Sequence, residues 1–197
     1  MRSLTLLLSL FAIAACGDDN SVNSNEKARR AYLGLDKSVS KSLALGFQGY
    51  NAATNANIPA QSVNGDATGT LGISGHVDQG TPGQAQMNLD VAMTMYSDGP
   101  FVIDDKNTKI TVTYATGATA PLLSLKLNSS SGDTLTGTLM GDYSMSGDLK
   151  GTVTLDLSLS GTFTGTAPNV MRAVGSTHVT GTAVNSDGGM FTVDVTI

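Results

Sequence analysis

Cysteine, histidine, tryptophan and charge are all scarce in this chain of 197 residues. The single cysteine, Cys16, cannot form an internal disulfide, and one cysteine cannot build a Cys-rich zinc site. The two histidines, His76 and His178, do not form the His-x-x-x-His pair of a helical zinc site. Neither a Gly-x-Ser-x-Gly elbow nor a P-loop occurs. We therefore expect a fold that needs no metal, cofactor or disulfide, and a protein that is not an enzyme.

Charged residues make up only 14% of the chain, and the net charge is −5. An acidic surface is a poor partner for nucleic acid or for anionic lipid head groups, so we expect no nucleic-acid partner. Glycine, threonine and serine are abundant where many proteins have charged residues, and aromatic residues are few. This composition favours half-buried strands joined by tight turns.

The first sixteen residues have the layout of an export signal. A basic start at Arg2 precedes an apolar run over residues 4–13, which only Thr5 and Ser9 interrupt. The run is too short for a permanent membrane-spanning helix, which needs roughly 20 apolar residues. Charge, apolar core and small residues before a cleavage site follow the order of a cleaved signal.

The end of this leader, Ile13-Ala14-Ala15-Cys16, resembles the lipobox of bacterial lipoproteins, where the chain is cut just before the cysteine. The resemblance implies a signal peptide over residues 1–15, a diacylglyceryl thioether on Cys16 and an acyl chain such as palmitate on its amino group. Two or more chains hold a protein stably on a membrane, at ~0.8 kcal/mol per buried CH₂. Gly17 differs from the aspartate associated with inner-membrane retention in such families, which favours the outer membrane, on its periplasmic or surface face. An ordinary cleaved signal and a buried N-terminal helix are the alternatives.

A polar tether and a helical segment follow the leader. Residues 16–23 include no apolar period, and the seven residues after Cys16 reach at most ~25 Å. Residues 24–58 form the predicted helical segment, with the helix itself over 24–53 and a break at Gly34, and residues 57–64 are a predicted connector. Gly46 and Gly49 each cost ~1 kcal/mol of helix propensity, which predicts close packing against a sheet. Apolar residues recur at steps of three and four on one helix face: Ala28, Tyr32, Leu35, Val39, Leu43, Phe47 and Tyr50.

From residue 65 to residue 197 the apolar period changes to two, as in strands with one buried and one solvated face. We predict a mainly β fold: an antiparallel meander of about eight long strands, forming a curved sheet or a barrel. The N-terminal amphipathic helix packs on it, so that residues 24–58 and 65–197 form one globular unit. The apolar positions are odd-numbered in nearly every strand, which predicts hairpin loops of odd length. The clearest example is Met145 facing Leu149 across a three-residue loop.

Few side chains suggest chemistry. His76 and Asp78 could share a metal if His178 lies on a neighbouring strand, although solvated strand histidines are the simpler interpretation. Three aspartates could supply paired carboxylates, but aspartates at hairpin ends usually form turns: Asp142, Asp148 and Asp156. Three methionines could line a pliable cavity or simply belong to the core: Met87, Met93 and Met95. The threonine-rich faces could bind sugars or other surfaces, or be ordinary exposed strand.

These observations predict a lipid-anchored envelope protein that is structural or binds an apolar ligand, with its membrane contact through Cys16. The predicted architecture resembles, at that level only, lipoprotein carriers that hold acyl chains in a half-barrel. The alternative is a small outer-membrane barrel, because the alternating end Phe191-x-Val193-x-Val195-x-Ile197 looks like the C-terminal signal of such proteins. That end has Ile197 where an aromatic residue is usual, and aromatic girdles are lacking. An envelope enzyme is the third alternative, and the ligand and oligomeric state stay open.

Overall fold

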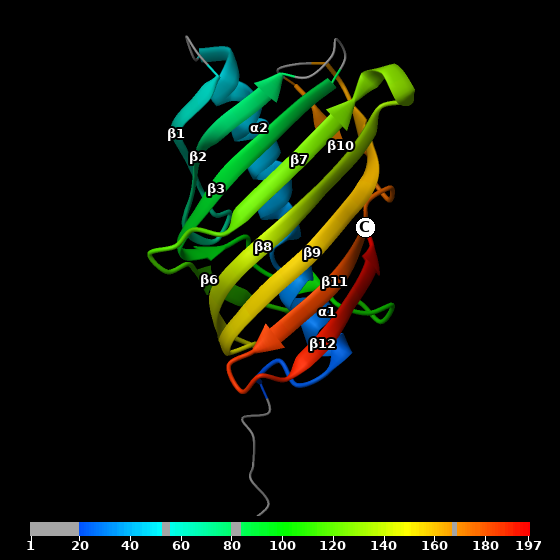
Figure 1. Ribbon diagram of the computed structural model, residues 1–197. Helices are drawn as coiled ribbons and strands as arrows, with labels where there is room; N and C mark the ends of the chain where they lie inside the picture. Colours follow the sequence, from blue (N-terminus) through cyan, green and yellow to red (C-terminus); the bar gives the residue numbers. More distant parts are fainter. Residues whose placement is uncertain (1–19, 53–55, 80–83, 167–168) are drawn as a thin grey trace, which may run out of the picture.

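The computed structural model describes residues 20–52, 56–79, 84–166 and 169–197. Figure 1 shows long twisted strands in one sheet, with both helices on a single face of it. The predicted fold is confirmed: mainly β, with antiparallel strands in meander order and N-terminal helices packed on them.

Two consecutive helices form the N-terminal layer: α1 (Asn25–Leu33) and α2 (Asp36–Ala52). The side chain of Ser24 caps α1 by accepting a hydrogen bond from the Lys27 amide at 3.3 Å. The predicted break at Gly34 is confirmed, since α1 ends immediately before it. The Tyr114 hydroxyl donates to the Ala31 carbonyl at 2.8 Å and so satisfies an acceptor in the last turn of α1.

The strands form a large sheet of ten strands and a small hairpin of two. The small hairpin consists of β4 (Phe101–Val102) and β5 (Lys109–Ile110). The large sheet consists of β1 (Asn57–Asn64), β2 (Thr68–Gln79), β3 (Gln84–Ser97), β6 (Val112–Ala115), β7 (Leu122–Asn128), β8 (Thr134–Gly147), β9 (Gly151–Thr164), β10 (Met171–Arg172), β11 (His178–Asn185) and β12 (Met190–Thr196).

The strands of the large sheet are hydrogen-bonded to one another in a linear order. It runs β1-β2-β3-β6-β8-β9-β11-β12, while β7 also pairs with β3 and β8, and β10 pairs with β9. The short strands β6 and β7 therefore share one place between β3 and β8, which leaves about eight positions across the sheet. Among the described strands β1 and β12 do not pair with each other, so the sheet is curved and open.

The register of the paired strands places odd-numbered residues opposite odd-numbered residues, as the sequence predicts. Leu127 lies opposite Leu135, and Leu139 lies opposite Leu157, so odd-numbered residues share a face across several strands. The prediction for Met145 is wrong, because it pairs with Gly151 and not with Leu149. The reason is the neighbouring strand β6, which pairs with β8 as far as residue 147 and delays the turn. The resulting loop has five residues, an odd number as expected.

The apolar face of the sheet is buried beneath the helices. Leu155, Leu157 and Leu159 are each at most 2% exposed, whereas Asp156 and Ser158 between them are exposed. Helix α1 packs beside β12, and α2 packs on β1, β2 and β3. The helical layer thus crosses the concave side from one sheet edge toward the other, as Figure 1 shows.

The two mid-helix glycines of α2 lie where the helix touches the sheet, as predicted. A Cβ on Gly46 would lie 2.8 Å from the sulfur of Met87, and one on Gly49 would lie 2.7 Å from Cγ2 of Ile58. Both distances are shorter than real Cβ contacts. Close approach of helix and sheet therefore offsets the low helix propensity of glycine.

Residues 57–64 are not a connector but the edge strand β1. The sequence lacks an alternating strand pattern here, because Ile58 is the one buried residue of β1 and the other side chains are exposed or half-buried. Pro59 is tolerated there, since an edge strand has one side free of ladder bonds and the register is irregular between Ile58 and Gln61. The helical segment accordingly ends before residue 57, and the β domain begins there and not at 65.

Met95 departs from the predicted inward stripe. Met87 and Met93 are buried core residues, but Met95 is 59% exposed and has a positive φ of 47°. A bulge causes this, because the register between β2 and β3 shifts at this point. The inward face then passes to even-numbered Tyr96, which is fully buried.

The predicted tether over residues 16–23 is shorter than expected. The Asn20 carbonyl accepts a hydrogen bond from the Lys150 amide at 2.9 Å, and the Val22 carbonyl accepts one from the Asn185 side chain at 2.9 Å. Val22 itself is 1% exposed. The chain is therefore docked from Asn20 onward, at the turns that join β8 to β9 and β11 to β12. Residues 16–19 lie outside the described residues.

Candidate functional site

A cavity of about 450 Å³ lies between α2 and one end of the sheet, where β3 begins and β7 and β9 end. Its volume falls within the range of ~300–1,000 Å³ that is usual for small-molecule pockets. The lining residues come from five parts of the chain: Phe47, Gln84, Ala85, Leu127, Ser129, Asp133, Phe163, Gly165, Thr166 and Val170.

The walls of this cavity are apolar and its rim is polar. Phe47, Leu127 and Phe163 are buried core residues that also line the cavity, and Val170 completes the wall. Asp133 and Thr166 are exposed at the rim. Among the described residues of this lining, Asp133 is the one with an ionisable side chain. The arrangement can hold an apolar molecule with a polar end outward, and its described lining supplies no nucleophile with an adjacent base.

The cavity lies beside the place where α2 touches the sheet most closely. Gly46 brings α2 close to Met87, which is the next residue of β3 on the inner face after Ala85 of the cavity lining. One helix turn later the polypeptide approaches Ile58 on β1, at the edge of the sheet. Phe47 therefore faces the first residues of β3 and the last residues of β7 and β9 across open space.

A second cavity, of about 210 Å³, lies beside a buried cation. The side chain of Arg172 is 8% exposed and forms an ion pair with Asp36 at 2.7 Å. Its Nε and Nη2 also donate to Ser40 Oγ, at 3.0 and 2.8 Å. Nη1 of Arg172 and the hydroxyl of Thr177 are buried without a partner among the described atoms. These bonds join β10 to the start of α2 and act as a structural clamp.

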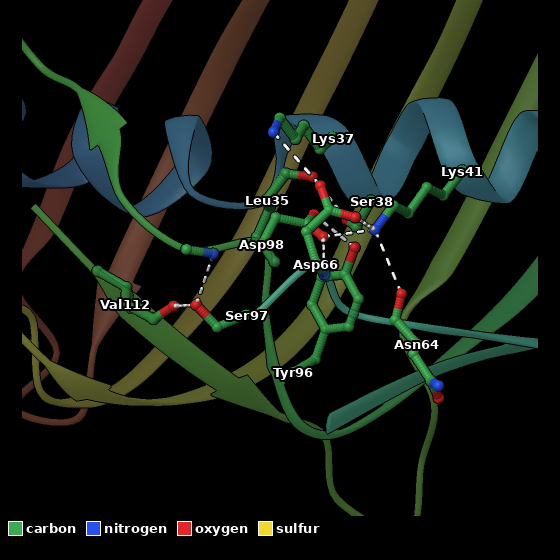
Figure 2. Close-up of polar contacts among 11 residues, drawn as sticks. Leu35, Lys37, Ser38, Lys41, Asn64, Asp66, Tyr96, Ser97, Asp98 and Val112 are labelled. Atoms are coloured by element: carbon green, nitrogen blue, oxygen red, sulfur yellow. Dashed lines mark hydrogen bonds and ion pairs between the residues drawn. The ribbon is translucent and has the colours of Figure 1, made fainter. Parts of the chain in front are cut away.

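A second polar cluster joins α2 to the β1–β2 and β3–β4 turns (Figure 2). These turns lie at the other end of β3 from the 450 Å³ cavity. Lys41 Nζ lies 2.7 Å from Asp66 and 2.5 Å from Asp98, and it lies over the ring of Tyr96. The Tyr96 hydroxyl donates to Asp98 at 2.5 Å. Ser97 Oγ donates to the Val112 carbonyl, as Figure 2 also shows, and it accepts from the Gly99 amide.

The electrostatics of this cluster are those of a satisfied ion-pair network. The hydrogen bond from Lys41 lowers the pKa of Asp66 below its ordinary value. Partial burial alone would lower the pKa of Lys41, but its bonds to Asp66 and Asp98 outweigh that effect and raise it. Burial raises the pKa of Tyr96, and so does its bond to Asp98. Every charge has a partner, so the cluster holds α2 in place.

The residues suggested for a metal site do not come together. His76 lies on β2 and His178 on β11, and four strand positions of the described sheet lie between these strands. His178 instead lies 2.8 Å from Asp194, and His76 lies 3.8 Å from Asp78. Over the described ranges, no three His, Cys, Asp or Glu side chains are grouped so that they could hold a metal ion.

Two of the three aspartates singled out from the sequence, Asp142 and Asp148, accept structural hydrogen bonds. Asp142 accepts a hydrogen bond from the Thr154 hydroxyl at 2.6 Å, across β8 and β9. Asp148 accepts one from the Thr111 amide at 2.7 Å and so fixes the β8–β9 turn. Asp156 is exposed on the outer face. Cys16, the predicted lipidation site, lies outside the described residues.

Sequence reasoning missed the cavity and both ion-pair clusters. Each depends on contacts between distant segments: Arg172 and Ser40 are 132 positions apart. One signal was available, because apolar Phe47 and Phe163 occur near the ends of their predicted elements, beyond the regular leucine pattern. No helix in the described part of the chain is long and apolar enough to cross a membrane.

Comparison with known proteins gives no family to which the chain can be assigned. No family model, no curated protein and no solved structure matches this chain significantly.

Proposed function

We propose that this protein is a non-enzymatic, lipid-anchored protein of the cell envelope that binds an apolar ligand in the 450 Å³ cavity. The observation that carries the ligand role is the cavity itself, with buried Phe47, Leu127 and Phe163 as walls and polar residues at the rim. The lipobox-like sequence before Cys16 supports the anchor and an outer-membrane location.

The direction of the strand side chains supports a packed domain over the alternative of a lipid-facing barrel. Leu155, Leu157 and Leu159 point into the core under the helices, while their polar neighbours are exposed. A barrel in a bilayer needs the reverse arrangement, with apolar residues outward. The described sheet is also open between β1 and β12.

Ligand binding can be tested on an unanchored chain that begins at Gly17 and so retains every described residue. Its affinity for a fluorescent fatty acid is measured by titration. Ala85 lines the cavity, and Ala85→Leu should weaken binding about tenfold or more, because the larger side chain occupies the cavity and tenfold corresponds to only ~1.4 kcal/mol.

The matched control is Ala92→Leu, on the same strand but at an exposed position of the opposite face. It should leave the affinity unchanged. If the unaltered chain does not bind the probe, or if both variants bind like it, the ligand role is wrong and a structural role remains.

The anchor is tested separately in cells. Cys16→Ser should abolish labelling with a radioactive fatty acid and move the protein from the membrane fraction to the soluble fraction. A Cys16→Ser protein that stays with membranes after a high-salt wash would show that the lipobox is not the only attachment.

A further inference from the structure

The cavity and the anchored end of the chain lie at opposite ends of the sheet. Asn20 is docked to Lys150 and Val22 to Asn185, both in turns at one end. The cavity is bordered by Ser129 and Asp133 of the β7–β8 turn, at the other end. In Figure 1 the β8–β9 and β11–β12 turns lie at the end of the sheet opposite the β7–β8 turn.

The length of the strands sets the distance between these ends. Strands β8 and β9 have 14 residues each and run from one end to the other. At ~3.3 Å per residue, this amounts to about 45 Å. Cys16 precedes Asn20 by four residues, which extend at most ~14 Å.

These two lengths limit how an anchored molecule can stand. For the cavity to face the anchoring membrane, the molecule would have to invert and carry Asn20 about 45 Å from the bilayer. A tether of ~14 Å is too short for that. It is also shorter than the ~25 Å that seven free residues would allow, because residues 20–22 are held by the domain.

We infer that the protein stands on its membrane with the cavity at the distal end, so that ligand enters and leaves on the side away from the anchoring bilayer. This inference rests on the proposed anchor at Cys16 and the proposed ligand role of the cavity. It assigns the polar rim around Asp133 and Thr166 as the surface at which a ligand is exchanged. The lipids that hold the anchor are not its direct source.

The absence of tryptophan makes the orientation measurable, because one introduced tryptophan can be excited selectively at wavelengths that the five tyrosines scarcely absorb. Thr152 and Thr136 are both exposed on the outer face, at the anchored end and toward the cavity end respectively. Thr136 pairs with Ser160, eight residues from Thr152 along β9, so the two positions lie ~26 Å apart along the strand.

The experiment uses the chain from Cys16 to Ile197, which contains every described residue. Its single cysteine is coupled to a maleimide lipid in vesicles that also carry dansyl-labelled lipid. Energy transfer from tryptophan to dansyl should be about threefold or more greater for Thr152→Trp than for Thr136→Trp, given their separation along the strand. Equal transfer, or greater transfer for Thr136→Trp, would overturn the inference.

Two controls make the result decisive. Each variant must melt as the unaltered chain does, and Ser160→Trp, opposite Thr136, replaces Thr136→Trp if that variant is unfolded. Because the lipid is attached chemically and no ligand is present, the outcome is independent of cellular lipidation and of ligand binding. Failure of the orientation is thus distinguishable from failure of the proposed function.

Discussion

At the scale of single residues, neighbouring side chains of strand β9 alternate between the buried core and the solvent-exposed face of the sheet. Leu157 is fully buried, opposite Leu139 of β8 and Gly181 of β11. Ser158, the next residue, is exposed on the outer face. Alternation of this kind is what a sheet with one solvated face requires.

Truncating the inner residue should therefore be far more costly than truncating the outer one. Leu157→Ala should lower the free energy of unfolding by about 2–5 kcal/mol, through lost burial and the cavity left behind. Ser158→Ala should change it by less than ~0.5 kcal/mol. Urea denaturation of the chain that begins at Gly17 measures both values. Similar losses for the two variants would contradict the assignment of faces.

Residue-level prediction from the sequence succeeds where burial follows a local period, as it does for Leu157. It fails where a bulge resets the period, as at Met95, since one inserted residue moves every later side chain to the other face. It also fails for Arg172, whose partners Asp36 and Ser40 are more than a hundred positions away. No local pattern carries that information.

At the scale of elements, helix α2 shows how packing overrides propensity. Gly46 and Gly49 weaken the isolated helix but allow its backbone to approach β1 and β3. The sequence predicted this contact, because two glycines on an otherwise regular helix need an offsetting gain. The same reasoning could not find β1, whose polar edge sequence lacks a strand period.

Gly49→Ala tests whether close packing on the sheet outweighs the low helix propensity of glycine. Alanine improves helix propensity by ~1 kcal/mol, but its Cβ would lie 2.7 Å from Ile58 and 3.2 Å from Gln61. Overpacking costs about 1–3 kcal/mol, so the variant should be less stable than the unaltered chain. Gln48→Ala, at the exposed neighbouring position, should be neutral or slightly stabilising. Increased stability of Gly49→Ala in thermal unfolding would show that the helix is not pressed on the sheet.

At the scale of the whole molecule, one open sheet joins an anchored end to a cavity end. The helices cover its concave face between them, and the polar clusters around Lys41 and Arg172 fix α2 at its start. The sequence predicted the layers and the parity, whereas the predicted leader lies outside the described residues. It could not predict the cavity, which brings together residues of α2, β3, β7 and β9, nor the docking of residues 20–22.

The docked segment is the feature on which the orientation of the cavity depends, and its loss should be measurable. A chain that begins at Ser24, acetylated to avoid a charge at the start of α1, loses the buried side chain of Val22 and two hydrogen bonds. Burial of valine contributes ~1.5–3 kcal/mol and each hydrogen bond ~0.5–1.5 kcal/mol, so this chain should be about 2.5–6 kcal/mol less stable than one that begins at Gly17.

A chain that begins at Asn20 is the matched control for this truncation, because it removes the tether but keeps every docking contact, and it should unfold like the longer chain. Equal stability of the Ser24 chain would mean that residues 20–23 belong to the tether. The reach from Cys16 would then return to ~25 Å. That reach still falls short of the ~45 Å needed to invert the sheet, but it would hold the anchored end less closely to the bilayer. The truncation series therefore decides how firmly the anchored end is fixed, and with it how strictly the cavity is kept away from the membrane.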